Sequence, residues 1–302
     1  MLELRDVPPD QVSVRLTAVV DRVARVRAAA RFLPLEVARE QVEETVDQTR
    51  DRSELLDVVD GDDVVGVLWL ARAGGGELIV HDLLLDDPAR VAELTPLLVD
   101  RARTAGSQLL GVGVHPGDPG RAALGAEPGF VPRATNMALS LDGEIADPGG
   151  LALRRMTDVE FEAFLTGNAD EYAGELVAAG MTDEAAAQQS RDQMAQLLPD
   201  GLTSPGMHFF TAWVGEEPVG SLWLCTLDPM AFVYDIVVRE DQRRKGYGAA
   251  IMNAAALWTR DRGHQVLGLN VFAHNPGARA LYDRLGYQVT QEYRALDVPD
   301  AG

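Results

Sequence analysis

One stretch of the sequence constrains the fold of this chain more than any other. An apolar, β-branched run from Phe232 to Val238 predicts a buried strand, and a short charged loop, Arg239 to Lys245, follows it. Gly246 and Gly248 come next, and then an apolar, Ala-rich helix expected over 249–262. Strand, glycine-bearing loop and helix in this order direct free backbone N–H groups and the positive end of a helix dipole toward one point. The stretch therefore predicts an anion-binding site at the start of this helix.

The loop offers the space and the charge that an anionic ligand needs. Gly246 and Gly248 lack a Cβ, so a phosphate can approach their backbone closely. Basic side chains add positive charge to the same loop: Arg239, Arg243, Arg244 and Lys245. The loop is not a dinucleotide fingerprint, because Ile251 stands where GxGxxG has its third glycine, and it lacks the GxxxxGK(S/T) of a nucleoside-triphosphate loop. An anion-binding turn without an enzymatic role stays open at this point.

Two motifs in this half of the chain resemble those of the GNAT N-acetyltransferase superfamily. The acetyl-CoA loop of that family reads Q/R-x-x-G-x-G/A after a central strand, and Arg243 to Gly248 fits every position. A second family element is a strand followed by N-x-x-A-x-x-x-Y-x-x-x-G-F/Y. It is matched by Leu267 to Phe272, Asn275, Ala278, Tyr282, Gly286 and Tyr287. The resemblance implies a mixed α/β fold, a twisted central sheet flanked by helices, with acetyl-CoA as co-substrate of an acyltransferase.

The first half of the chain carries alternating helical and extended patterns. The expected elements are helices over 10–30, 35–49 and 90–104 and strands over 55–59, 64–72, 77–85 and 109–114. The segment Asp142 to Gly150, DGEIADPGG, has the composition of a linker. The predicted domains are therefore 1–141 and 151–302, joined by a linker over 142–150.

After this linker the pattern of elements begins again. A strand over 151–156 precedes a helix that starts with Thr157 or Asp158 as N-cap and is expected to end near Gly167. The further expected elements are a helix over 182–198 and a hairpin of strands over 208–214 and 218–226. The strand, loop and helix described above follow this hairpin.

The second half repeats the first at the level of residues. The motif V-G-x-L-W-L at Val65 to Leu70 recurs at Val219 to Leu224, and Asp82 begins an apolar run as Asp235 does. A further set matches from Gly111 to Gly129: Gly111, Val114, Pro119, Gly120, Ala123, Leu124 and Gly129 correspond to Gly268, Val271, Pro276, Gly277, Ala280, Leu281 and Gly286. The chain is therefore expected to contain the same fold twice in tandem.

The first half lacks the coenzyme motif. The segment Asp86 to Leu94 stands where the second half has Arg239 to Gly248, and it contains no glycine and few basic residues. Two carboxylates, Asp86 and Asp87, would face a pyrophosphate there, which disfavours its binding. Two motif positions also differ, because Gly125 matches Tyr282 and Asp118 matches Asn275. The first half is expected to be a degenerate copy that covers the active half and helps to shape its acceptor cleft; binding of some other ligand stays open.

The resemblance implies a role for each motif residue on the coenzyme side. The pyrophosphate is expected at Arg243, Arg244, Lys245, Gly246, Tyr247 and Gly248. The pantetheine arm is expected to pair with Ile236, Val237 and Val238, where a backbone N–H polarises the thioester carbonyl. Asn275 either bonds the pantetheine amide or caps the helix that it precedes. Tyr282 matches the family tyrosine that gives a proton to the departing thiolate; a core tyrosine at helical spacing is the alternative.

The acceptor side is less clearly marked. Asp235 is the candidate general base, provided that Tyr234 and Ile236 point to the other face of the strand, although the matching Asp82 favours a structural role for both. The candidate acceptor-binding residues are Glu171 and Tyr172, expected between the first two helices of this half, and His208. A water chain in place of a single base stays open.

Composition excludes several functions. A formal net charge of −20 disfavours binding to nucleic acid or to an anionic membrane. The single cysteine, Cys225, rules out an internal disulfide, and no Cys/His cluster predicts a metal site. Neither a leader pattern nor an apolar stretch of membrane-spanning length is present, so a cytoplasmic protein is expected.

The sequence thus predicts an N-acetyltransferase that moves an acetyl group from acetyl-CoA to a primary amine of a small molecule by direct transfer in a ternary complex. The acidic composition mildly favours a cationic acceptor, such as a polyamine or an aminoglycoside-like compound. Three alternatives stay open: a non-catalytic acyl-CoA-binding or regulatory module, a transferase for a longer acyl group, and one that acts on a peptide amino terminus. A monomer or a homodimer is expected.

Overall fold

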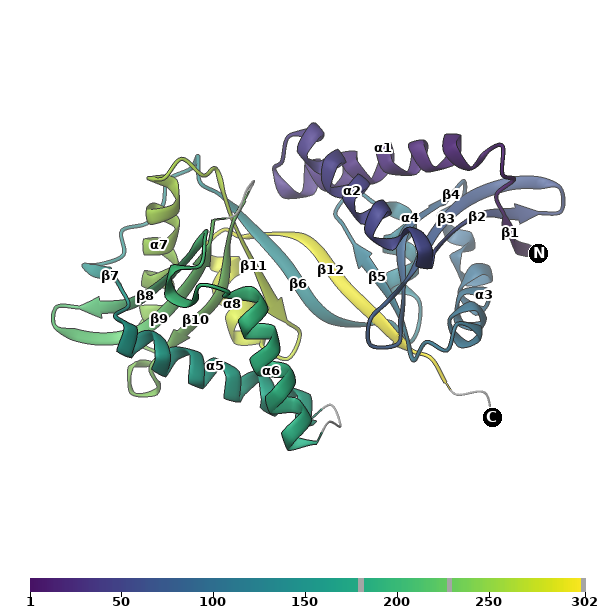
Figure 1. Ribbon diagram of the computed structural model, residues 1–302. Coiled ribbons are helices and arrows are strands. Elements are labelled where there is room, and N and C mark those ends of the chain that lie inside the picture. The colour runs from purple at the N-terminus through teal and green to yellow at the C-terminus, as the bar shows by residue number, and fades with distance from the viewer. Residues whose placement is uncertain (179–181, 227–229, 300–302) are drawn as a thin grey trace. The chain divides into compact units, whose positions relative to one another are not determined.

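The computed structural model describes residues 1–178, 182–226 and 230–299, and its contacts divide them into two compact units (Figure 1). Unit 1 contains residues 1–138 together with the described residues from Asn270 onward, and unit 2 contains the described residues of 139–269. The units therefore do not follow the order of the chain. Within the described residues, no helix has the length and apolar character needed to cross a membrane.

Unit 1 is a mixed sheet with flanking helices. Its strands are β1 (Leu2–Asp6), β2 (Ser53–Asp60), β3 (Asp63–Ala73), β4 (Glu77–Leu85), β5 (Leu109–Val114), β6 (Val131–Ser140) and β12 (Gln288–Asp297). Its helices are α1 (Val12–Arg31), α2 (Leu35–Thr49), α3 (Val91–Thr104), α4 (Pro119–Ala126) and α8 (Pro276–Arg284), with 3₁₀ turns at Arg50–Arg52 and Pro88–Arg90. The strands lie in the order β1-β2-β3-β4-β5-β12-β6, in which β4 and β5 run parallel and the other neighbours antiparallel.

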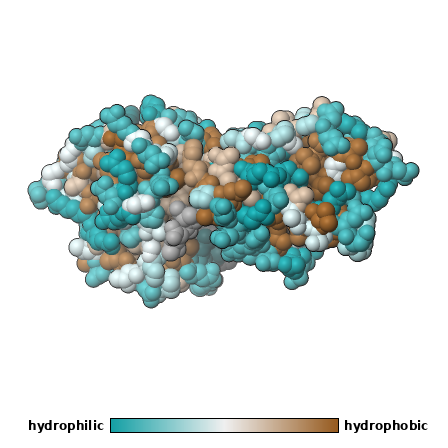
Figure 2. All heavy atoms as spheres, turned by 90° about the horizontal axis from the view of Figure 1, so that it is seen from above, coloured by the Kyte–Doolittle hydropathy of each residue, from teal (hydrophilic) through white to brown (hydrophobic). Residues whose placement is uncertain are grey.

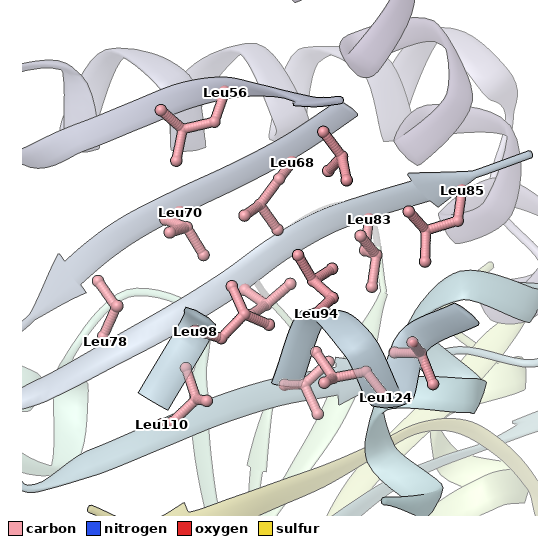
Figure 3. Close-up of a cluster of buried hydrophobic side chains, with 14 of the residues drawn as sticks. Leu56, Leu68, Leu70, Leu78, Leu83, Leu85, Leu94, Leu98, Leu110 and Leu124 are labelled. Atoms are coloured by element: carbon pink, nitrogen blue, oxygen red, sulfur yellow. The ribbon is translucent and has the colours of Figure 1, made fainter. Parts of the chain in front are cut away.

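Leucines form the larger core of unit 1. Those of the strands are Leu56, Leu68, Leu70, Leu78, Leu83 and Leu110, and they pack with Leu94 and Leu98 of α3 and Leu124 of α4 (Figure 3). Each of these side chains is 2% exposed or less. A smaller cluster contains Val67 and Trp69 of β3, which pack with valines of α1 and α2. The alternation of side chains along each strand thus supplies an apolar surface to a helix layer on either face.

Unit 2 is a second mixed sheet, with strands in the order β11-β10-β9-β8-β7. The strands are β7 (Leu151–Arg155), β8 (Met207–Val214), β9 (Glu217–Cys225), β10 (Ala231–Val238) and β11 (Val266–Phe272). The helices are α5 (Asp158–Ala178), α6 (Asp183–Leu197) and α7 (Tyr247–Arg260), with 3₁₀ turns at Gly201–Thr203 and Glu240–Gln242. β10 and β11 run parallel, and the other neighbours run antiparallel.

Aromatic side chains fix the two layers of unit 2. Phe209 of β8 contacts Phe161 and Phe164 of α5 edge-on, with ring centroids 4.7 and 5.9 Å apart. The next residue of the strand, Phe210, contacts Trp258 of α7, with centroids 5.1 Å apart. Neighbouring residues of β8 therefore face opposite helix layers, α5 on one side of the sheet and α7 on the other.

The surface is mixed in character. Figure 2 shows hydrophilic side chains interspersed with hydrophobic ones over the face that it presents. Single exposed apolar residues, such as Val14 and Val159, are common on folded chains and indicate no binding site by themselves.

Most elements expected from the sequence are confirmed, with bounds that differ by a few residues. One expectation is wrong: the helix that starts at Asp158 does not end near Gly167 but continues to Ala178. Glu171 and Tyr172 therefore lie on α5 and not in a segment between helices. A glycine inside a helix costs about 1 kcal/mol relative to alanine, and the residues beyond Gly167 offset this cost through the bonds of Asn168 to Asp235 and of Ser190 to the carbonyl oxygen of Ala169. The sequence patterns do not predict β1, α4, β6 or β12.

The two halves of the chain show the same order of elements. The series β1-α1-α2-β2-β3-β4-α3-β5-α4-β6 is followed by β7-α5-α6-β8-β9-β10-α7-β11-α8-β12. The repeated glycines also match in space, because a Cβ on Gly66 would meet the backbone of Leu84 and one on Gly220 that of Val237. β12, the last strand of the second series, lies in unit 1 between β5 and β6 of the first. The chain-order domains 1–141 and 151–302 remain a prediction, while the compact units combine elements from both series.

Candidate functional site

A bulge in β10 shapes the α5 side of the unit 2 sheet. Val233 pairs with Leu224 and Asp235 pairs with Trp223, so Tyr234 is an extra residue between the two pairs. The bulge places both Tyr234 and Asp235 on the α5 side. Tyr234 stacks on Trp223, with ring centroids 4.9 Å apart, and is 44% exposed. The expectation that Tyr234 points to the other face is therefore wrong, because strict alternation does not hold across a bulge.

Asp235 is held from the neighbouring helix. The Nδ2 of Asn168 on α5 donates a hydrogen bond of 3.1 Å to Oδ2 of Asp235, which is partly buried. An amide donor orients the carboxylate without cancelling its charge. Asn168 and Tyr234 are the residues that sequence reasoning missed here, and no local pattern marks either of them.

β10 separates from its parallel neighbour just before this bulge. The described pairs of β10 with β11 cover Ala231 to Val233, whereas the pairs with β9 continue to Val238. Among the described pairs, the backbone of Ile236 to Val238 thus has a strand partner on one side only. An extended ligand segment could use the other side by adding hydrogen bonds to it. Val237 is 37% exposed at this place.

The loop after β10 has the backbone conformation of an anion site. Arg244 and Gly246 both adopt positive φ, 62° and 87°, and Gly246 is the N-cap of α7. No side chain caps this helix, so the first-turn N–H groups of α7 are left to other partners. A Cβ built on Gly246 would meet nothing within 4 Å, which shows that the space above the loop is open. Such a row of N–H groups binds phosphate well.

Hydrogen bonds below the loop fix its position. The buried Gln242 donates from Nε2 to Oε1 of Glu217, at 2.6 Å, and accepts at Oε1 from Nζ of Lys245, at 2.9 Å. Nε of Arg243 donates to the carbonyl oxygen of Val238, at 3.3 Å. The side chains of Arg243 and Arg244 are exposed, where they can contact a bound anion.

The second motif lies on α8, in unit 1. Oδ1 of Asn275 accepts a hydrogen bond of 3.0 Å from the N–H of Ala278, so Asn275 caps this helix as expected. Tyr282 is 6% exposed, and its ring centroid lies 5.8 Å from that of Tyr287. The capping role of Asn275 leaves its Nδ2 for another partner, and a donor contact for it and for Tyr282 stays a prediction.

The expected acceptor residues do not all come together. His208 lies on the α7 side of the sheet, with its ring 4.8 Å from that of Trp258, whereas Asp235 lies on the α5 side. Nε2 of His208 is 2.8 Å from Oγ1 of Thr226. Burial, and then the charges of Arg155 and Arg262, lower the pKa of His208 to about 4. The side chains of Glu171 and Tyr172 lie outside the part of the chain that the structure describes.

Unit 1 contains the same bulge with different chemistry. In β4 the extra residue is His81, which stacks on Trp69 with ring centroids 4.6 Å apart, and the pairing of β4 with β5 ends at Val80. The buried Asp82 forms an ion pair with Arg22 of α1. A cation therefore neutralises this carboxylate, at the place where an amide contacts Asp235. The loop after β4 has no glycine, and Asp87 caps its 3₁₀ turn by accepting from the N–H of Ala89.

Comparisons with known proteins agree with this geometry. The model of the acetyltransferase (GNAT) family matches residues 171–287. The uncharacterized N-acetyltransferase YycN of Bacillus subtilis is 37% identical over 147 residues, which are 46% of this chain and 94% of that protein. A mycothiol acetyltransferase of Clavibacter michiganensis is 28% identical over 263 residues, 82% of this chain and 81% of that protein. The crystal structure of a GCN5-related N-acetyltransferase from Sphaerobacter thermophilus matches with a TM-score of 0.58 at 17% identity, over 99% of this chain and 97% of that one.

The fold and the loop at the start of α7, together with these relatives, define the protein as an acyltransferase. The chain belongs to the acetyltransferase (GNAT) family. The mixed α/β fold expected from the resemblance is confirmed, and so is its occurrence in two copies.

Proposed function

We propose that this protein transfers an acetyl group from acetyl-CoA to a primary amine of a small molecule, by direct transfer in a ternary complex. The observation that carries the proposal is the loop from Arg243 to Gly248. Its two left-handed residues and its uncapped helix start fit the pyrophosphate of a coenzyme, and its exposed arginines supply the opposite charge.

The roles of the other residues follow from the family resemblance. Beyond the bulge, the backbone of Ile236 to Val238 pairs with the pantetheine arm, and Asn275 adds an amide contact. The hydroxyl of Tyr282 gives a proton to the departing thiolate, and Asp235 takes one from the acceptor amine, oriented by Asn168. Bound acetyl-CoA supplies the acetyl group as an activated thioester.

The acceptor is proposed to be cationic. Beside Asp235, the exposed ring of Tyr234 lies on Trp223, and an aromatic face next to a carboxylate attracts an ammonium group. The acidic net charge of −20 adds a long-range attraction for cations. The acceptor panel includes polyamines, aminoglycosides, peptides with a free amino terminus and the amine that mycothiol acetyltransferases acetylate, because those relatives match most of the chain.

The test combines calorimetric titration with a thiol-release assay. Acetyl-CoA is expected to bind at one site per chain, and Gly248→Val is expected to abolish binding because its side chain occupies the space of the phosphate. Gly143→Val is the control, since Gly143 lies in the linker segment with open space around it. Normal binding by Gly248→Val would remove the loop from the proposal.

The remaining outcomes separate the alternatives. Binding without turnover on any amine would identify a non-catalytic acyl-CoA-binding module. Faster turnover with a longer acyl-CoA would identify a different donor, and activity confined to peptides would identify an amino-terminal acetyltransferase. Two coenzyme sites per chain would contradict the degenerate first half.

A further inference from the structure

Basic side chains converge in unit 1 where β4 and β5 separate. Arg27 and Arg31 come from α1, Arg121 from α4, and His115 follows the end of β5. Arg121 donates from Nη1 to the carbonyl oxygen of His81 in the β4 bulge, at 2.9 Å. The charges of all three arginines act on His115, and those of Arg31 and Arg121 act on Arg27, so the groups lie within electrostatic reach of one another. We call these four residues, Arg27, Arg31, Arg121 and His115, the basic cluster.

The basic cluster holds more positive charge than the protein neutralises. Asp118 pairs with Nε of Arg121, at 2.6 Å, and Asp82 is already paired with Arg22. In the described part of the chain, no carboxylate lies within ion-pair distance of Arg27 or Arg31. Burial, and then repulsion from Arg31 and Arg121, lowers the pKa of Arg27 to about 10. Such an excess of like charge is costly in a partly buried place, and an anion would relieve it.

Several polar atoms of the basic cluster are buried without a hydrogen-bond partner among the described residues. They are Nε of Arg27, Nη2 of Arg121 and Nε2 of His115. The side chains of Arg121 and His115 are 2% and 1% exposed. Nδ1 of His115 lies 2.7 Å from the carbonyl oxygen of Thr290, to which it donates, so Nε2 of the neutral imidazole is an acceptor and does not itself donate to an anion. Buried polar groups are nearly always satisfied, so the two guanidinium orphans, Nε of Arg27 and Nη2 of Arg121, point to a missing acceptor.

The four side chains of the basic cluster all come from the first half of the chain. The repeat aligns His115 with Phe272 and Arg121 with Ala278, so the second half has no basic side chain at either place. The cluster is therefore no remnant of a coenzyme site shared by both halves. Strand β12 contributes to it, because Gln291 accepts a hydrogen bond of 3.5 Å from Nη2 of Arg31.

We infer that unit 1 binds the oxyanion of a small metabolite, a carboxylate or a phosphate, at Arg27, Arg31 and Arg121, beside the imidazole of His115. Guanidinium groups match the geometry of both oxyanions, and each offers several donors to one anion. The site is independent of the acetyl transfer proposed for the loop before α7. It gives the degenerate half a ligand of its own, on the side of the sheet where Asp82 forms an ion pair with Arg22.

The test follows the histidine imidazoles by NMR in the full chain while inorganic phosphate or acetate is added. Binding is expected to be saturable and to shift the imidazole signal of His115. This signal is assigned by its absence from the spectrum of His115→Gln. Arg27→Gln is expected to weaken binding by ~10-fold or more, the scale of one lost charge-assisted hydrogen bond. Arg25→Gln is the matched control, because Arg25 is exposed on the same helix and is expected to leave the affinity unchanged.

Each result decides the inference. Tighter binding of phosphate would identify a phosphate ester as the ligand class, and tighter binding of acetate would identify a carboxylate. Signals that move only for His208 or His264 would place the anion elsewhere and overturn the site. Absence of saturable binding by both probes would overturn it as well, as would equal affinities for Arg27→Gln and the unchanged chain. A failed acetyl-CoA titration would leave this result untouched, since it concerns the other loop.

Discussion

Asp82 and Asp235 occupy the same place in the two copies of the fold, but a different helix side chain meets each of them. Arg22 neutralises Asp82, which is 1% exposed, whereas the amide of Asn168 contacts the more accessible Asp235. A guanidinium neutralises the carboxylate that it pairs with, whereas an amide donates a hydrogen bond without adding a charge. The two aspartates thus differ in the helix side chain that contacts each of them, Arg22 for Asp82 and Asn168 for Asp235.

Replacing Asp235 by Asn tests its proposed role as general base directly. The variant Asp235→Asn is expected to lower kcat/KM for the amine by ~10²–10⁴, the usual scale of general base catalysis, with little change in acetyl-CoA affinity. Thiol release and calorimetry measure the two quantities. Asp261→Asn, at the exposed end of α7, is the control. An unchanged pH profile and kcat/KM would exclude Asp235 as the base.

Tyr282 and Tyr287 provide a second comparison between residues. Tyr282→Phe is expected to lower kcat by ~10²–10⁴ and to leave the acetyl-CoA affinity almost unchanged, because only the proton donor is removed. Tyr287→Phe is the control, since the buried hydroxyl of Tyr287 has no hydrogen-bond partner among the described residues. Steady-state kinetics on both variants decides the matter, and a fully active Tyr282→Phe enzyme would remove Tyr282 from the mechanism.

At the scale of elements, the starts of α5 and α7 are built for opposite purposes. α5 is closed by a capping box: the N–H of Thr157 donates to Oε2 of Glu160, at 2.8 Å, and the N–H of Glu160 donates to Oγ1 of Thr157, at 3.3 Å. α7 instead begins at Gly246 with no side-chain cap. The capping box therefore supplies partners for N–H groups at the start of α5, whereas the N–H groups at the start of α7 are left for a ligand.

The capping box gives a prediction of stability. Thr157→Ala is expected to lower the free energy of unfolding by ~1 kcal/mol, the usual value of an N-cap. The bond from the Thr157 N–H lowers the pKa of Glu160, so the stability gained from this carboxylate is present above its unfolded pKa and is lost as the pH falls. Urea unfolding at neutral pH measures the effect. Thr166→Ala, an exposed position later in α5, should change stability by much less.

At the scale of the whole molecule, buried histidines make the folded state sensitive to acid. Burial, and then the charges of nearby arginines, lower the pKa of His81 to about 4 and that of His115 to about 3, both from 6.5. The unfolded chain therefore binds protons at a pH where the folded chain does not. Stability is complete above pH 6.5 and falls as the pH decreases toward the folded-state pKa values.

Unfolding at several pH values tests this expectation. Each of the two histidines should contribute a slope of ~1.4 kcal/mol per pH unit between the unfolded and folded pKa values. His115→Gln should remove the contribution of one histidine, ~1.4 kcal/mol per pH unit, from this slope. This change is separate from any effect of the substitution on the stability at neutral pH. A slope that stays the same in this variant would show that folding does not suppress the protonation of His115.

The features that rest on local pattern can be predicted from the amino-acid sequence. The strand, glycine loop and helix from Phe232 onward, the helix caps and the two-copy repeat all follow from spacings within a few residues or from matched motifs. The family and the coenzyme loop could be recognised for the same reason. The longer extent of α5 could not be recognised, because a lone Gly167 locally indicates a helix end, while the residues after it contact β10 through Asn168 and α6 through the carbonyl oxygen of Ala169.

Only the tertiary structure decided which distant side chains meet. The contact of Asn168 with Asp235, the bond from His115 to Thr290 and the convergence of Arg27 with Arg121 join residues that no local pattern relates. The position of β12 between β5 and β6 also could not be predicted, since it depends on strand edges that lie far apart in the sequence. Periodicity fixes which face of an element is apolar, but the partner that covers it is set by the free energy of packing the whole unit.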